Sequence, residues 1–163
     1  MTALYSTTMW ELLGNAKTLV KNETGTGGTF SSIKRVQKGV VVNPVDFPFI
    51  SIIPVFERPE RNLGGYIETV RRIRFEVYAV KDKGRSVVRQ NMGILKNLSD
   101  MFQVHTSTWR MPDSILKWNT AFSSNIVSMS FSDQALPFKR GLIHTGELTV
   151  DFWSKDPVHA GIA

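Results

Sequence analysis

The segment Tyr66–Val80 constrains the fold most strongly, because its polar and apolar residues alternate as they do in a β-strand. Its apolar side chains would share one face: Ile73, Phe75, Val77 and Ala79. Its polar side chains would share the other: Arg72, Arg74, Glu76 and Tyr78. At about 3.3 Å per residue, such a strand would reach nearly 50 Å. It therefore predicts one arm of a hairpin that projects beyond the body of the protein.

Two segments have the periodicity of amphipathic helices. Thr8 and Glu11 have capping-box spacing, and apolar residues then recur along one stripe of Met9–Val20. Glycines in the segment Gly25–Gly28 end this helix. A second apolar stripe predicts a helix over residues 86–102, after a turn at Lys81–Gly84.

The remaining strands and loops complete an α-β-β-β-α-β-β order. The additional predicted strands are residues 30–42, Phe47–Phe56, Asn125–Ser132 and Leu142–Trp153. The charged segment Glu57–Gly65 is predicted as a loop, and residues 103–121 as a long connection of the kind that often binds partners. This order predicts an α+β fold, a largely antiparallel sheet packed with two main helices, in one domain over residues 1–163.

The chain lacks the convergent groups that catalysis requires. It contains no cysteine, and its three histidines are too far apart in sequence for a metal-binding pattern. Glu147 and Asp151 would lie about 13 Å apart, too far for a carboxylate pair acting on one bond, and are typical of a solvated strand face. The segment Gly25–Gly28 follows a helix, which favours a turn over a phosphate site. We therefore expect no enzymatic activity, no cofactor and no metal.

No segment has the features of a membrane span or a signal peptide. Apolar stretches stay well below the roughly 18 residues that cross a bilayer. Residues 1–6 lack the basic and apolar regions of a secretory signal. We therefore expect no membrane partner and a cytoplasmic site of synthesis.

The positive charge is concentrated in one region. The chain carries a formal net charge of +6, and residues 57–89 hold nine Lys or Arg against five Asp or Glu. Such clustering is a feature of nucleic-acid-binding proteins. However, Glu68, Glu76 and Asp82 are interleaved with the basic residues, as on a solvated face or a protein interface. Because no nucleic-acid-binding motif accompanies them, an interface is the favoured interpretation.

Three tryptophans lie off the apolar stripes. Trp109 and Trp118 fall in the long connection, and alternation places Trp153 on the outward face of the last strand. Tryptophan and arginine anchor many protein interfaces, so we favour an interface for Trp109 and Trp118, whereas Trp153 fits an interface or a core equally well.

The order and pattern of these elements resemble the tail terminator (tail completion, or neck) proteins of long-tailed bacteriophages. The resemblance covers about residues 5–155 and is carried by the helix Met9–Val20, the apolar strand Phe49–Pro54, the long strand Arg72–Tyr78, the helix Val87–Phe102 and the closing segment Arg140–Val150 with its R-G-x-I start. The two-tryptophan connection has no counterpart in this pattern.

This resemblance implies a structural virion protein at the neck, assembled in the host cytoplasm. Its subunits would form a hexameric ring that caps the tail tube, stops its polymerisation and joins it to the head connector. The implied partners are other copies of the chain, the tail-tube protein, a head-completion or connector protein, and genomic DNA passing through the lumen without sequence-specific binding. A projecting hairpin and exposed tryptophans suit such subunit contacts, so the candidate interface residues are Tyr66, Arg71, Arg72, Arg74, Trp109, Trp118 and Trp153.

Other functions remain open at this point. A head-proximal connector or stopper protein of the same neck would use the same assembly logic. A tube subunit would form long polymers, and a small basic DNA-binding module would bind DNA with strong salt dependence.

Overall fold

The computed structural model describes residues 9–40, 46–62, 64–80, 87–103, 121, 123–135 and 142–157. The elements follow the predicted order: α1 (Met9–Asn22), β1 (Arg35–Lys38), β2 (Phe49–Asn62), β3 (Tyr66–Val80), α2 (Val87–Phe102), β4 (Ser123–Ala135) and β5 (Leu142–Pro157). The predicted α+β class is confirmed.

The five strands form one mixed sheet in the order β1-β2-β3-β5-β4. Only β1 and β2 are parallel, and each of the other neighbouring pairs is antiparallel. The central strand β3 is paired along its whole length with β5 and along most of it with β2. The sheet is thus largely antiparallel, as predicted, and is organised around the fifteen-residue strand.

One face of the sheet, which we call the helix face, carries the hydrophobic core. Both helices pack on it, because the buried residues of α1 and α2 join those of β2, β3 and β5 in one cluster. The apolar set predicted for β3 lies here, with Ile73, Phe75 and Val77 fully buried. The Phe102 ring of α2 stacks on Phe75 at 4.8 Å between centroids and meets Phe152 edge-on at 5.8 Å.

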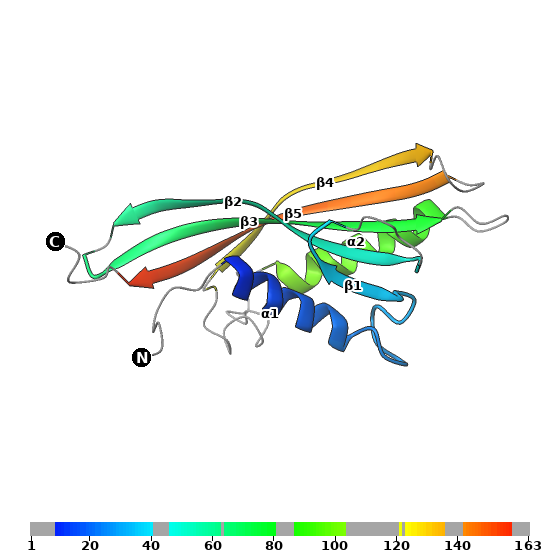
Figure 1. Cartoon of the computed structure of the whole chain (residues 1–163), viewed down its shortest axis with the longest axis horizontal. Coiled ribbons are helices and arrows are strands. Elements are labelled where there is room, and N and C mark those ends of the chain that lie inside the picture. The colour runs from blue at the N-terminus through cyan, green and yellow to red at the C-terminus, as the bar shows by residue number, and fades with distance from the viewer. Residues whose placement is uncertain are drawn as a thin grey trace.

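The strands β2, β3 and β5 continue past the two helices as a projecting arm, which Figure 1 shows on the left. In β2, residues 49–52 are buried, whereas every residue from Pro54 to Asn62 except half-buried Phe56 is exposed. The predicted projecting hairpin is confirmed, but the predicted loop over Glu57–Gly65 is wrong up to Asn62. Pro54, Pro59 and two register shifts break the alternation in this stretch, so the sequence pattern does not show the strand.

The predicted strand over residues 30–42 is confirmed only at Arg35–Lys38. Before it, the chain turns, and the Phe30 amide donates to the Glu23 carbonyl at 2.8 Å. Phe30 and Ile33 are buried in the core from this non-strand segment. The Lys81–Gly84 turn and the tryptophans Trp109 and Trp118 lie outside the described residues.

Two close contacts position α2 on β5. The side-chain amide nitrogen of Asn91 donates to the backbone carbonyl of His144 at 3.0 Å. The same nitrogen lies 2.7 Å from Nδ1 of the His144 ring. His144 is thus a buried strand histidine. At Gly146, an added Cβ would lie only 2.7 Å from the Leu95 Cδ1 and 3.6 Å from the Phe131 ring. The glycine allows the helix to approach the strand this closely.

We expect Gly146→Ala to lower the free energy of unfolding by about 1–3 kcal/mol, because the added methyl overpacks against fully buried Leu95. Gly93→Ala is a matched control, since that helical position is exposed and has open space around it. It should raise stability by about 0.5–1 kcal/mol. Chemical denaturation measures both, and equal unfolding free energies for G146A and the wild type would contradict this account.

Candidate interaction surface

The second face of the sheet, which we call the polar face, carries charged, hydroxyl and aromatic side chains. Its members on the three central strands include Ser51, Arg72, Arg74, Glu76, Tyr78, Glu147, Thr149, Asp151 and Trp153. Within the described ranges, no group of three or more His, Cys, Asp or Glu side chains could hold a metal ion. No helix in the same ranges is long and apolar enough to cross a membrane. The candidate residues Arg72, Arg74 and Trp153 lie on the polar face, which is therefore the candidate interaction surface.

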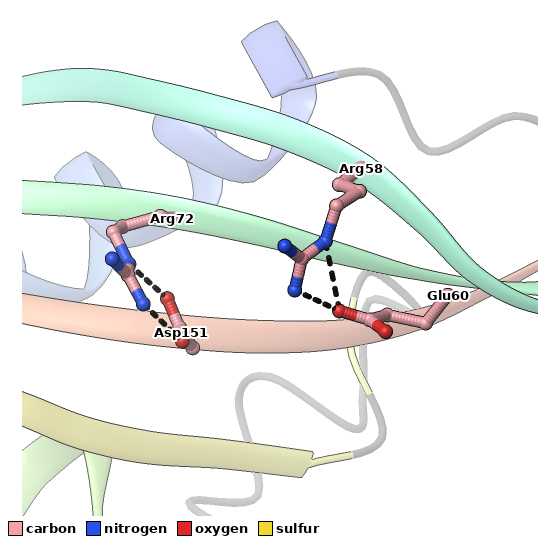
Figure 2. Close-up of polar contacts among 4 residues, drawn as sticks. All are labelled: Arg58, Glu60, Arg72 and Asp151. Carbon is pink, nitrogen blue, oxygen red and sulfur yellow. Dashed lines mark hydrogen bonds and ion pairs between the residues drawn. The ribbon is translucent and has the colours of Figure 1, made fainter.

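A bidentate ion pair joins β3 to β5 on this face. The Arg72 guanidinium donates to both carboxylate oxygens of Asp151, at 2.6 and 2.9 Å, as Figure 2 shows. Hydrogen bonding to Asp151 raises the pKa of Arg72, against the opposing effect of its partial desolvation. The guanidinium carbon also lies 4.6 Å from the Phe56 ring centroid, a cation–π contact with β2. Arg72 thus ties three strands together where the arm begins.

A second group surrounds Glu76. Arg74 donates to one of its carboxylate oxygens at 2.8 Å, and the Tyr78 hydroxyl donates to the other. The Tyr78 ring stacks on Phe49 with centroids 4.7 Å apart. Burial raises the pKa of the Tyr78 phenol, and its hydrogen bond to Glu76 raises it further. Glu147 lies directly opposite Glu76 on β5, so Arg74 compensates a like-charge pairing.

The prediction that Arg71 lies at a subunit contact on the surface is wrong. Its side chain is 1% exposed and lies on the helix face of the arm. It donates to Asp156 at 2.7 Å and to Glu57 at 3.0 Å, while Thr69 donates to the same Asp156 carboxylate. The Arg71 Nε has no hydrogen-bond partner in the part of the chain that the structure describes. Arg71 is therefore an internal brace of the arm.

Four of the five arginines of β2 and β3 are paired within the chain. Arg58, Arg71, Arg72 and Arg74 each contact a carboxylate, although the Arg58–Glu60 pair is exposed and lies within β2, as Figure 2 shows. Asp151, predicted to be solvated, is instead buried. In the part of residues 57–89 that the structure describes, most of the arginines of β2 and β3 are therefore paired with carboxylates.

The other candidate residues have different surroundings. Tyr66, at the start of β3 near the arm tip, is 52% exposed. Trp153 is half-buried on the polar face, opposite Val70 of β3 and Ser123 of β4. The fold therefore brings Arg72 and Arg74 together with Trp153 on the polar face, and separates Arg71 from them.

Sequence reasoning missed Phe56 on the polar face, and it missed Glu57 and Asp156 around Arg71 on the helix face. Glu57 and Asp156 reach Arg71 from strands that are 14 and 85 residues away in sequence. Asp156 lies beyond the predicted end of the last strand, and Glu57 lies in the predicted loop. The surplus of arginines on one strand was the available signal, because arginines inside a sheet require carboxylates nearby.

Comparison with known protein families finds no family model that matches this chain, and comparison with curated proteins finds no similar sequence. The resemblance to tail terminator proteins stays a prediction.

We expect Arg71→Met to destabilise the protein by roughly 3 kcal/mol, because it leaves Asp156, which is mostly buried, without its counter-ion. Arg58→Met removes an arginine from the exposed pair with Glu60 and should cost under about 1 kcal/mol. Urea unfolding of the two variants tests this difference. A cost as small for R71M as for R58M would show that Arg71 is not a brace.

The raised pKa of Tyr78 predicts that the protein loses stability at alkaline pH. That pKa is raised in the folded state, so the folded protein holds the phenol proton more tightly than the unfolded chain does. Tyrosines of the unfolded chain ionise near pH 10. This contribution to stability is complete below about pH 10 and is lost as the pH rises toward the folded-state pKa. Tyr78→Phe should remove it.

Tyrosinate absorbance during an alkaline titration measures this effect. The wild type should show a late-ionising fraction that Y78F lacks, whereas Tyr66→Phe, which alters an exposed tyrosine, should retain it. Identical late fractions in the wild type and Y78F would refute the assignment.

Proposed function

We propose that this chain is a structural virion protein of a long-tailed bacteriophage. Its subunits form a ring, with six subunits, that caps the tail tube, ends tube polymerisation and joins the tail to the head connector. The order of helices and strands along the chain supports the proposal, since it matches the pattern that carries the resemblance.

The projecting arm is the observation that carries this proposal. A closed ring joins subunits head to tail, so each subunit needs two different lateral surfaces. The arm offers one such surface, because β2 from Pro54 to Asn62 is largely exposed and Tyr66 lies near its tip. The helix-covered body offers the other.

The arm also has the rigidity that a ring contact needs. Arg71 links Glu57 of β2 to Asp156 of β5, and Arg72 links β3 to Asp151 of β5. These ion pairs fix the strands of the arm relative to one another beyond the hydrophobic core. A neighbouring subunit then binds a preorganised surface and pays little conformational entropy.

The proposed partners are other copies of the chain, the tail-tube protein and a head-completion or connector protein. Genomic DNA would pass through the ring lumen without sequence-specific binding. Pairing of the arm arginines with internal carboxylates supports this last point, since neutralised guanidinium groups release few counter-ions from a phosphate backbone.

Negative-stain imaging and mass-resolved sizing of the purified chain test the proposal. Closed rings of one size are the expected result. Long tubes would identify a tube subunit instead, and monomers that bind DNA with steep salt dependence would identify a DNA-binding module. Rings that bind a connector protein but not the tail-tube protein would identify a head-proximal stopper.

Two substitutions of exposed apolar side chains test the arm. Tyr66→Ser removes an exposed ring near the arm tip, and the control Val40→Ser removes a 74% exposed side chain that lies outside the arm and both helices. Loss of a central interface aromatic typically costs 2 kcal/mol or more, about thirtyfold in affinity. We expect Y66S to shift the rings toward monomers by about this factor while V40S leaves them intact. Unchanged rings in Y66S would remove the arm tip from the contact.

A further inference from the structure

Strand β4 forms an open edge of the sheet. It is the terminal strand beside β5, and Figure 1 shows it along the upper right margin. All six residues of Val127–Ser132 are exposed. Of the strands in the described ranges, only β5 pairs with β4. The outward backbone groups of this stretch are therefore available to another strand.

The opposite margin of the sheet is protected against such pairing. On the arm, the free edge of β2 contains Pro54 and Pro59, which cannot donate backbone hydrogen bonds. Its register shifts at Val55 and at Glu60, and four of the eight residues Val55–Asn62 are charged. Prolines, irregular register and charge are the devices by which proteins block strand addition.

Strand β4 lacks nearly all of these devices. Its sequence, SSNIVSMSFSDQA, has no proline, no lysine and no arginine, and Asp133 is its only charged residue. Val127, Met129 and Phe131 are 41%, 40% and 41% exposed. After one register shift near Val127, residues 128–135 pair regularly with β5. This edge is long and nearly uncharged, and its pairing with β5 is regular from Ser128 to Ala135.

The helix face continues the apolar surface beside β4. Met129 and Phe131 lie on that face, opposite Leu148 and Gly146, and Leu95 of α2 also lies close to Gly146. Val88 and Met92 precede Leu95 by seven and three residues, which places them along the same side of the helix. Both are about half exposed. A strand added to β4 would bring further apolar area against this surface.

We propose that β4 pairs with β4 of a second copy of this chain, antiparallel, about a two-fold axis at Ser130. In this register, Met129 lies opposite Phe131 of the second copy, and Ser128 lies opposite its Ser132. The apolar pairs fall on the helix faces and the serines on the polar faces, so the two sheets join into one of ten strands.

The chemistry of β4 fits its own copy. Antiparallel self-pairing at Ser130 places no like charges opposite each other, because Asp133 lies outside the paired residues Ser128–Ser132. The chain carries a net charge of +6, which repels a second copy, but none of its positive charge lies on β4. Charge repulsion between two copies is therefore low when they meet at β4.

Single cysteines test the register directly, since the chain has no native cysteine. In Ser130→Cys the two thiols would lie across the axis, within the spacing of about 4.4–6.8 Å between Cα atoms that a disulfide allows. In Ser128→Cys they would be displaced by four residues, roughly 14 Å along the strands. Mild oxidation should therefore give mostly covalent dimers for S130C and at least tenfold fewer for S128C. A mixture of S128C with Ser132→Cys should form heterodimers.

Met129→Lys and Val55→Lys give an independent readout. Each replaces an exposed apolar side chain with lysine on a free edge of the sheet, on β4 and on the arm, respectively. We expect M129K to reduce the S130C cross-link at least tenfold, because it places a charge opposite Phe131 of the second copy, and V55K to leave the cross-link unchanged. Monomeric S130C after oxidation, or equal cross-linking by S128C, would overturn the proposal, as would an unchanged cross-link in M129K. Ring closure uses a different, head-to-tail contact, so rings without this cross-link refute only the strand pairing.

Discussion

The structure depends on how three arginines are accommodated in its central strand. Arg71, Arg72 and Arg74 lie where β3 is paired on both sides, and a guanidinium there is costly unless a carboxylate meets it. The two strands that flank β3 supply these groups to Arg71 and Arg72: Glu57 comes from β2, and Asp151 and Asp156 come from β5. Arg74 pairs with Glu76 of β3 itself. This requirement fixes the register of the strands beyond the reach of the hydrophobic core. A long arm becomes possible because ion pairs continue where helix packing ends.

The parts of the fold that depend on periodicity could be predicted from the sequence. The apolar stripes of α1 and α2 and the alternation of Ile73, Phe75 and Val77 are local patterns. The side chains that pack against them in the core need only be apolar, so their identity does not have to be known in advance. The outer half of β2 could not be predicted, because Pro54, Pro59 and two register shifts hide its period. The parallel strand β1 is too short, at four residues, for its bounds to be visible in the sequence.

The candidate surface was harder to predict, because pairing between charges is not local. Arg71 and Arg72 are neighbours in sequence with the same residue type, yet one is buried in a carboxylate cluster and the other lies on the polar face. Alternation does predict that they face opposite sides. Only the tertiary register reveals that Asp156 lies within reach of the first and Asp151 of the second. A count of local charge therefore does not show that Arg71 and Arg72 are paired with carboxylates within the chain.

The placement of prolines and charges also explains why the two free edges of the sheet differ. The free edge of β2 carries prolines and charges that prevent strand addition, so the arm can contact a neighbour only through side chains. The edge of β4 presents a regular backbone with serine and apolar side chains, which suits backbone pairing. A subunit with these two margins can form one contact specified by side-chain chemistry and another specified by strand register. Because the two contacts use different physical interactions at opposite edges of the sheet, each can form or fail without the other.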